Sequence, residues 1–173
     1  MSQLLHPSII NYYGFSMKDF KGDQNPIILT ECSSKGTLYD IVKYHKQISK
    51  KANWTDTKKL INIYGIASAL SYLHAHNIIH RNLNPLTIHE TENLYPKLDV
   101  FNNLEIQIPN IKSDINRPVN GSLLFTAPEI LNEAGYSKSS DIYSFGMIVY
   151  IIMNNKIPSL KSKSNDQTNF LLS

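Results

Sequence analysis

The stretch His80-Arg81-Asn82-Leu83-Asn84-Pro85 gathers polar side chains into six residues that end in a proline. Amides and a proline in such a short segment favour a loop over a helix or a strand. The apolar pair Ile78-Ile79 comes directly before it, and the polar character continues to Thr87. The sequence therefore predicts a polar loop that follows a short buried segment.

A long helix is predicted upstream of this loop, from about Thr55 to Ala75. Thr55 is suited to the N-cap, Asp56 to the first turn, and Asn77 to the end of the helix. Apolar residues recur at helical spacing along it, as expected for a helix with one buried face: Leu60, Ile63, Tyr64, Ala67, Leu70 and Leu73.

The remaining elements alternate between short strands and helices. Two strands with a short connection suit an antiparallel pair, and a continuous apolar segment near the end suits a buried helix. The expected order is a strand at Ile9–Phe15, a strand at Ile27–Cys32, a helix at Thr37–His45, the long helix, a weak strand at Lys97–Phe101, a loop at Asn102–Asn120, and a buried helix at Asp141–Met153. This pattern alone indicates a mixed, helix-dominated domain.

Charge and composition exclude several classes of protein. The chain has 173 residues, a net charge of +3, and six lysines but no arginine between Lys43 and Lys59. A lysine-rich segment of this kind suits a solvated loop better than a nucleic-acid or membrane patch, so we expect neither partner. Cys32 is the only cysteine, which suits a reducing compartment and a cytoplasmic location.

Neither a targeting segment nor a membrane span is expected. The start, Met1–Pro7, has no basic region followed by a long apolar run, so it is not expected to be a signal peptide. The longest apolar run, Met147–Met153, is far too short to cross a bilayer.

Five segments resemble the protein kinase family, in the family's order and spacing. The opening stretch resembles the catalytic loop H-R-D-L-K-P-x-N. His6–Ile10 is similar to the turn before the fourth strand, and Leu29–Cys32 to the fifth strand and hinge. Gly121–Glu129 is similar to the A-P-E end of the activation segment, and Ser140–Gly146 to the start of the central helix. The residues in these segments are most similar to those of the tyrosine-kinase-like group.

The resemblance implies an α+β fold that is mostly the helical large lobe, with two strands of the small-lobe sheet. Residues 1–160 are expected to form this partial domain, and residues 161–173 a polar, disordered tail. The Gly-rich loop and the phosphate-pairing lysine of the family would lie upstream of residue 1, since the seven glycines here form no G-x-G-x-x-G.

The positions at which the family performs its chemistry hold other residues here. The resemblance places Asn82 where the family has its catalytic carboxylate, beside His80 and Arg81. It places Thr87 and Val100 at the two metal-ligand positions. A register slip would recruit Asp99 instead of Val100, but it would turn that side chain to the opposite face of the strand.

Other implied positions are structural or belong to the nucleotide cleft. Thr30 resembles the gatekeeper and Glu31 and Cys32 the hinge, and His89 falls where the family has an apolar residue under the adenine. Cys32 is expected to be half-buried rather than reactive. The retained scaffold residues are Phe101, which the family stacks on the loop histidine, Ala127, Pro128, Glu129, and Asp141, which the family uses to anchor the loop.

These replacements favour an inactive kinase-like domain, a pseudokinase that acts as a binding or scaffolding module for proteins, including another kinase. No cofactor is then expected. Two alternatives stay open: an active serine/threonine kinase that uses ATP and Mg²⁺, and a truncated fragment without independent function. The oligomeric state stays open as well.

Overall fold

The computed structural model describes residues 4–48, 54–101, 123–132 and 135–158. In these ranges four helices and two small antiparallel sheets follow one another, so the α+β class predicted from the sequence is confirmed. Their order is β1 (Tyr12–Ser16), β2 (Ile27–Thr30), α1 (Leu38–Ile48), α2 (Asp56–Ala75), β3 (Ile88–Glu90), β4 (Pro96–Leu98), α3 (Pro128–Leu131) and α4 (Lys138–Asn154). The predicted loop at 102–120 and tail at 161–173 lie outside the described residues.

Helix α2 has the predicted bounds. The Thr55 hydroxyl accepts a hydrogen bond from the Lys58 N–H at 3.3 Å, which satisfies an amide of the first turn. The backbone leaves the helix at Asn77, whose φ of 56° is left-handed. Local capping chemistry was therefore sufficient to place both ends.

The predicted buried face of α2 is wrong in part. Leu60 and Tyr64 are 62% and 77% exposed. The buried face is rotated relative to the prediction and includes Asn62 and Gly65, which have no apolar side chain. Its residues are Asn62, Gly65, Ile66, Ala69, Leu70 and Leu73. Gly65 explains the rotation, because a Cβ at this position would lie 2.7 Å from Pro96 Cγ. Strand β4 can approach α2 closely only along that face.

Helix α4 begins at a capping box in which Ser137 and Ser140 bond each other's backbone amides. It packs against α2 through Ile148, Ile151 and Ile152, which are fully buried. The expectation that α4 is buried on nearly every side is wrong. Its outer residues are about half exposed, since no described element covers them: Ile142, Tyr143, Tyr150 and Met153.

The strands are shorter than predicted. Strands β1 and β2 pair antiparallel from Tyr12↔Thr30 to Ser16↔Ile27, with a register shift between Tyr12 and Gly14. Ile10 bonds the Leu98 carbonyl instead of continuing β1, at 3.0 Å. The predicted strand at 97–101 is β4, which ends at Leu98 and pairs with β3, a strand that the sequence did not predict.

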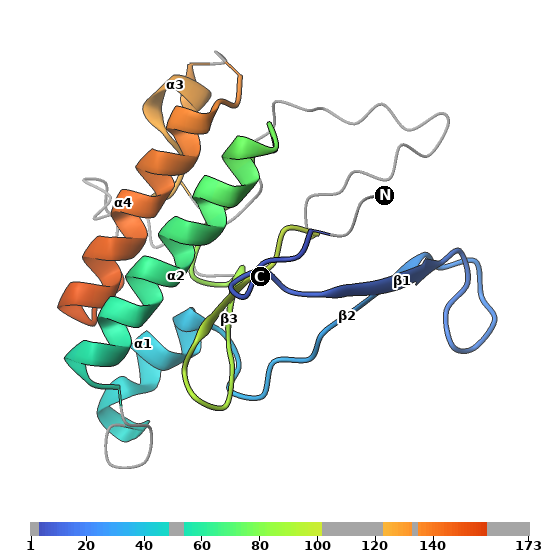
Figure 1. Ribbon diagram of the computed structural model, residues 1–173, viewed down its shortest axis with the longest axis horizontal. Coiled ribbons are helices and arrows are strands. Elements are labelled where there is room, and N and C mark those ends of the chain that lie inside the picture. The colour runs from blue at the N-terminus through green and yellow to red at the C-terminus, as the bar shows by residue number, and fades with distance from the viewer. Residues whose placement is uncertain (1–3, 49–53, 102–122, 133–134, 159–173) are drawn as a thin grey trace, which may run out of the picture.

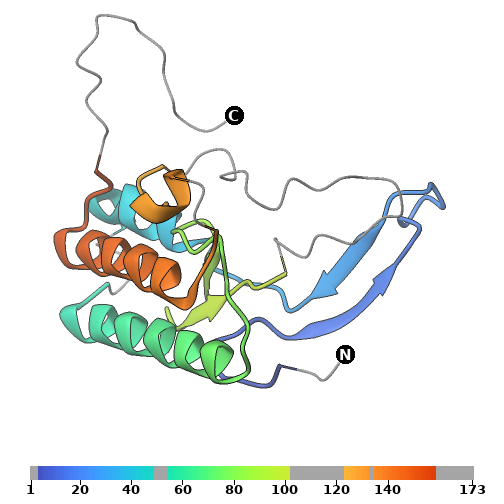
Figure 2. The same ribbon diagram turned by 90° about the horizontal axis from the view of Figure 1, so that it is seen from above.

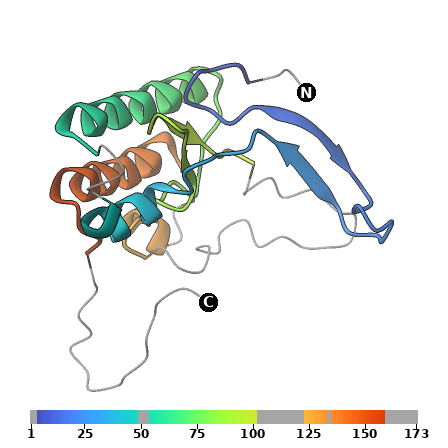
Figure 3. The same cartoon turned by 90° about the horizontal axis from the view of Figure 1, so that it is seen from below.

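The core lies where α1, α2 and α4 meet the β3–β4 pair (Figure 1). The β1–β2 ribbon extends away from the helices, as the view from above also shows (Figure 2). Seen from below, β3 and β4 lie between the ribbon and the helical layer (Figure 3). Among the described residues, no helix has the length and apolar character that a membrane crossing requires.

Candidate functional site

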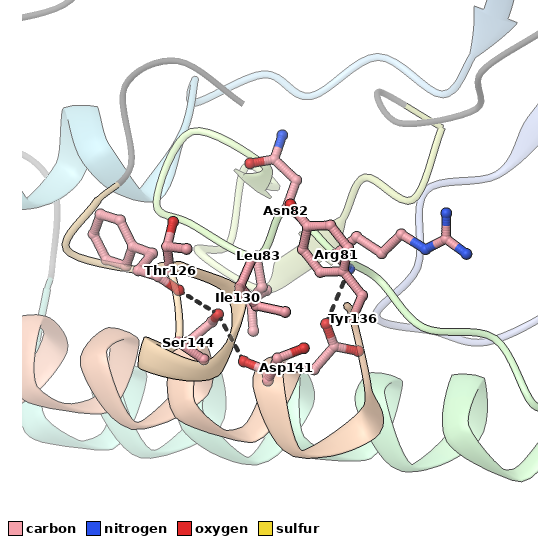
Figure 4. A pocket seen from close by; sticks show the side chains of 11 residues that line it. Arg81, Asn82, Leu83, Thr126, Ile130, Tyr136, Asp141 and Ser144 are labelled. Atoms are coloured by element: carbon pink, nitrogen blue, oxygen red, sulfur yellow. Dashed lines mark hydrogen bonds between the residues drawn. The ribbon is translucent and has the colours of Figure 1, made fainter. Parts of the chain in front are cut away.

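The backbone of the loop at 80–87 is held by one buried carboxylate. Asp141, in the first turn of α4, is 1% exposed. Its Oδ2 accepts hydrogen bonds from the His80 N–H and from His74 Nε2, both at 2.8 Å. Its Oδ1 accepts from the Arg81 N–H at 2.9 Å, which Figure 4 shows as a dashed line. These bonds hold Arg81 in a left-handed conformation with φ 69°.

His80 is a structural part of the same loop. Its ring is buried, and Nδ1 accepts a hydrogen bond from the Asn82 N–H at 3.3 Å. Burial lowers the pKa of this imidazole, and the Asp141 carboxylate opposes the shift without reversing it. His80 is therefore neutral at neutral pH and serves to fold the loop rather than to supply charge.

Asn82 presents an amide at the centre of the loop. Its Oδ1 accepts a hydrogen bond from Asn84 Nδ2 at 2.8 Å, and its side chain points away from α4 (Figure 4). Asn84 stands where the kinase pattern has a lysine and was not singled out from the sequence. It also donates to the Asn82 carbonyl at 3.0 Å. Asn84 thus donates to Asn82 at a point where the pattern has an ammonium group and a carboxylate.

Thr87 is buried under the same loop. Its hydroxyl lies 3.0 Å from the carbonyl oxygens of Asn82 and Asn84, to which it donates, and it accepts from the Asn84 N–H at 3.2 Å. A hydroxyl committed to the backbone in this way is a poor ligand for a cation. Thr87 closes the loop instead.

Val100 and Asp99 lie at the second metal-ligand position. Val100 packs against the hydrophobic core. The Asp99 carboxylate accepts a hydrogen bond from the Phe101 N–H at 2.9 Å, and its other oxygen lies 3.8 Å from His89 Nε2. Magnesium requires hard oxygen ligands in near-octahedral geometry. The residues at these positions do not fit it, and the described part of the chain has no metal-binding cluster of histidine, cysteine and carboxylate side chains.

The hinge segment is fastened to both sheets. Thr30 is half-buried at the end of β2. The Glu31 carboxylate accepts from the Asn11 N–H at 3.1 Å and from Lys97 Nζ at 3.0 Å. Because Glu31 turns inward, the alternation of an extended chain turns Cys32 outward. Cys32 is exposed, and the expectation that it is half-buried is wrong.

His89 places a polar ring at the position predicted to lie under an adenine. The ring is half-buried and bonds the Ser33 hydroxyl through Nδ1 at 3.0 Å, while Nε2 faces Asp99. The imidazole therefore lies between Ser33, which follows the hinge, and the Asp99 carboxylate. An apolar floor for a purine is not present at this point.

The other predicted scaffold residues lie around the loop. Phe101 is half-buried with its ring 5.3 Å from that of Tyr12, and its stacking on His80 stays a prediction. Ala127 is buried at the N-cap of α3, with Pro128 and Glu129 in the first turn. Proline suits this position because the amide it lacks has no partner inside a helix.

A shallow pocket separates the catalytic loop from α3 and α4 (Figure 4). Ser144 crosses its floor and donates to the Phe125 carbonyl at 2.6 Å. Burial raises the pKa of the Tyr136 phenol, and the nearby Arg81 charge opposes the shift. The pocket is lined by Arg81, Asn82, Leu83, Phe125, Thr126, Ala127, Ile130, Tyr136, Ser140, Asp141 and Ser144. Tyr136 and Ser144 were not predicted as site residues.

A family model described as the protein kinase domain matches residues 1–172. The chain belongs to the protein kinase family. The kinase domain here is 32% identical over 159 residues to a serine/threonine-protein kinase of Drosophila persimilis, covering 88% of this chain and 19% of that protein. It is 30% identical over 175 residues to the RAF proto-oncogene serine/threonine-protein kinase of Xenopus laevis, covering 96% and 25%.

A third relative extends the range of organisms. A putative serine/threonine-protein kinase/receptor of Acanthamoeba polyphaga mimivirus is 29% identical over 160 residues, which are 91% of this kinase-family chain and 9% of that protein. The chain thus spans a quarter or less of the length of these three relatives. The family prediction is confirmed, and the RAF match agrees with the tyrosine-kinase-like grouping. The predicted boundary at residue 160 stays a prediction.

Proposed function

We propose that this kinase-family chain is a pseudokinase, a domain that has lost phosphoryl transfer and acts as a binding or scaffolding module. The observation that carries the proposal is a contrast within one loop. Asp141 still bonds the backbone of His80 and Arg81, while the three chemical positions hold Asn82, Thr87 and Val100.

The base position supports the proposal through its charge. Phosphoryl transfer depends on orienting the nucleophile and stabilising spread negative charge. The Asn82 amide bonds Asn84 and has no proton affinity that would let it act as a base. General-base assistance is worth about 10²–10⁴-fold, so this loss alone would leave a slow enzyme.

The metal positions make the loss more severe. The Thr87 hydroxyl is committed to two carbonyls, and the Val100 side chain packs on the core. The Asp99 carboxylate is engaged by the Phe101 amide and faces His89. Without a metal the β- and γ-phosphate charge has no counterion from these positions. Three independent deficits act on the same step.

The expected partners are proteins, including another kinase that docks on the large lobe. The small net charge of +3 supports this over a nucleic-acid or membrane partner. Exposed apolar side chains on α4, Ile142, Tyr143, Tyr150 and Met153, offer protein-facing area. The single cysteine supports a cytoplasmic location, and no cofactor is required for this role.

The second candidate is an active serine/threonine kinase that uses ATP and Mg²⁺. It is favoured by the printed names of the relatives, which describe serine/threonine-protein kinases. Because Asn82, Thr87 and Val100 have no carboxylate, an active enzyme would need another residue to supply the carboxylate at the base and metal positions.

Nucleotide binding and transfer distinguish the two. We expect the thermal unfolding temperature of the wild-type chain to be unchanged by ATP with Mg²⁺, because a ligand stabilises a fold only if it binds it. We expect no transfer of radiolabel from ATP to a generic protein substrate. A Mg²⁺-dependent thermal shift together with labelled substrate would refute the proposal.

A variant with Asn82→Asp, Thr87→Asn and Val100→Asp provides the matched comparison. Cooperative unfolding of this variant, followed by the fluorescence of the single tryptophan, shows that it still folds. A Mg²⁺ shift in the variant and not in the wild type assigns the loss to these three residues. Protease resistance of the wild-type chain separates a binding module from a fragment without function, which would be degraded rapidly.

A further inference from the structure

Glu90, the last residue of β3, is a carboxylate in the hydrophobic core. It is 0% exposed, and its neighbours in the strand pair, Ile88 and Leu98, are also fully buried. Neither side-chain oxygen has a hydrogen-bond donor among the described residues. Charged side chains are almost never buried without a partner, so the Glu90 carboxyl must be protonated or must bind a cation.

Asn62 on α2 lies beside this carboxyl and is also 0% exposed. Its Nδ2 donates to two carbonyl oxygens, those of Lys58 and Leu94, both at 3.1 Å. Both amide hydrogens are therefore used, and none is left for an ionised Glu90. Asn62 Oδ1 has no donor among the described residues. A carboxyl and an amide oxygen thus share one buried site that is short of a hydrogen.

The charged groups on the surrounding elements face elsewhere. Lys35 pairs with Glu92 at 2.8 Å, and Lys58 lies 4.5 Å above the Tyr95 ring. His89, the preceding residue, turns to Ser33 and Asp99 on the other face of β3. Burial raises the pKa of Glu90 to about 8, because the ionised carboxylate would lose its hydration in the core. No cation in the described residues compensates a charge at this position.

The backbone of Glu90 connects this site to the segment after the hinge. Its N–H donates to the Gly36 carbonyl at 2.9 Å, and its carbonyl accepts from the Lys35 N–H at 3.2 Å. Thr37 forms an isolated bridge with His89, and α1 begins at the next residue, Leu38. Movement of β3 would release this segment.

We propose that Glu90 is a protonated carboxylic acid in the folded chain at neutral pH and that its O–H donates a hydrogen bond to Asn62 Oδ1. Loss of this proton breaks the contacts between β3 and residues 35–37. This single hydrogen neutralises the Glu90 carboxyl and gives Asn62 Oδ1 a donor. The buried pair is then a pH-sensitive connection between α2, β3 and the hinge side of the cleft. It does not depend on whether the chain transfers phosphate.

The sign of the pH dependence follows from the pKa. The ordinary pKa of a glutamate is 4.5, and that of Glu90 in the fold is raised to about 8. The stabilising contribution of the proton is therefore complete below the ordinary value and is lost as pH rises through the folded pKa. Between the two values the unfolding equilibrium constant rises by up to about tenfold per pH unit from this group.

The test measures urea unfolding from about pH 5 to about pH 9 for the wild type, Glu90→Gln and Glu92→Gln. Glutamine keeps a donor for Asn62 Oδ1 and cannot ionise, so we expect Glu90→Gln to lack this part of the slope. Glu92 is exposed and two residues away, so Glu92→Gln is expected to keep it. Carboxyl carbon resonances in wild-type and Glu90→Gln spectra identify Glu90 and give its midpoint directly.

Three outcomes decide the proposal. A Glu90 midpoint near 8, a slope lost only in Glu90→Gln, and faster exchange of the Lys35 and Glu90 amides above that pH support it. A midpoint near the ordinary value overturns it. Equal slopes in the wild type and Glu90→Gln overturn it as well, and so does a chelator-sensitive stability that Glu90→Gln removes, because a bound cation would then neutralise the carboxylate.

Discussion

Asp141 is a buried carboxylate that accepts hydrogen bonds from three donors on two segments, two backbone amides of the catalytic loop and His74 at the end of α2. A buried carboxylate of this kind is stable only because its charge strengthens each hydrogen bond that it accepts and each donor is well placed. His74 was not among the site residues predicted from the sequence. Its role as a partner of Asp141 became visible only when α2 and α4 were seen side by side.

Replacing Asp141 by alanine is predicted to destabilise the fold by about 3 kcal/mol. The change leaves the buried His80 amide and the partly buried Arg81 amide without acceptors, and each buried loss costs about 1–3 kcal/mol. Urea unfolding followed by tryptophan fluorescence measures the difference.

Asp56→Ala is the control for this prediction. Asp56 also lies in the first turn of a helix, but its side chain is 94% exposed, and its ion pair is with Lys59. An exposed pair contributes about 1 kcal/mol or less. If Asp141→Ala costs no more than Asp56→Ala, the proposed role of Asp141 as the anchor of the loop is wrong.

At the scale of elements, α2 and α4 each contain one glycine, and the two differ in what surrounds them. A Cβ at Gly65 in α2 would lie 2.7 Å from Pro96 Cγ and 2.8 Å from Ser8 Oγ. A Cβ at Gly146 in α4 would meet nothing within 4 Å. The same substitution therefore has opposite expected effects in the two helices.

Gly65→Ala is predicted to destabilise the chain by about 1–3 kcal/mol through overpacking against β4. Gly146→Ala is predicted to stabilise it by up to about 1 kcal/mol, because alanine is the better helix former. Thermal unfolding of both variants checks the pair. A stabilising Gly65→Ala would contradict the close approach of α2 and β4.

The limits of prediction at this scale follow from packing. The ends of α2 were predictable because Thr55 and Asn77 act locally. Its buried face was not, because Asn62 and Gly65 do not look apolar and are selected by their contacts with Leu94 and Pro96. Strand β3 was missed because it has only three residues, which include a histidine and a glutamate, and because its bridge to Thr37 joins segments distant in the chain.

At the scale of the whole molecule, the β1–β2 ribbon extends away from the helical body (Figure 1). Tyr13, Phe15 and Phe20 are 70%, 55% and 88% exposed. An exposed strand edge with apolar neighbours promotes association between chains. The ribbon is therefore the part of the described chain most exposed to aggregation.

The isolated chain is predicted to self-associate through this ribbon. Tyr13→Thr with Phe15→Thr keeps strand propensity and removes apolar area, so we expect it to lower the associated fraction in sedimentation velocity. Tyr64→Thr removes a similarly exposed ring from α2 and is expected to have little effect. A monodisperse wild-type chain with a sharp thermal transition would contradict the prediction.

The sequence by itself determined the kinase family, both ends of α2, and the identities of Asn82, Thr87 and Val100, because motif spacing, capping and side-chain chemistry are local properties of the chain. Only the tertiary structure decided that Thr87 closes the loop through its hydroxyl, that His89 faces Asp99, and that Glu90 shares a buried site with Asn62. The Thr87 contacts lie within one loop, whereas those of His89 and Glu90 join side chains on different segments. Burial and hydrogen-bond satisfaction arise only when those segments pack, and residue type alone does not specify them.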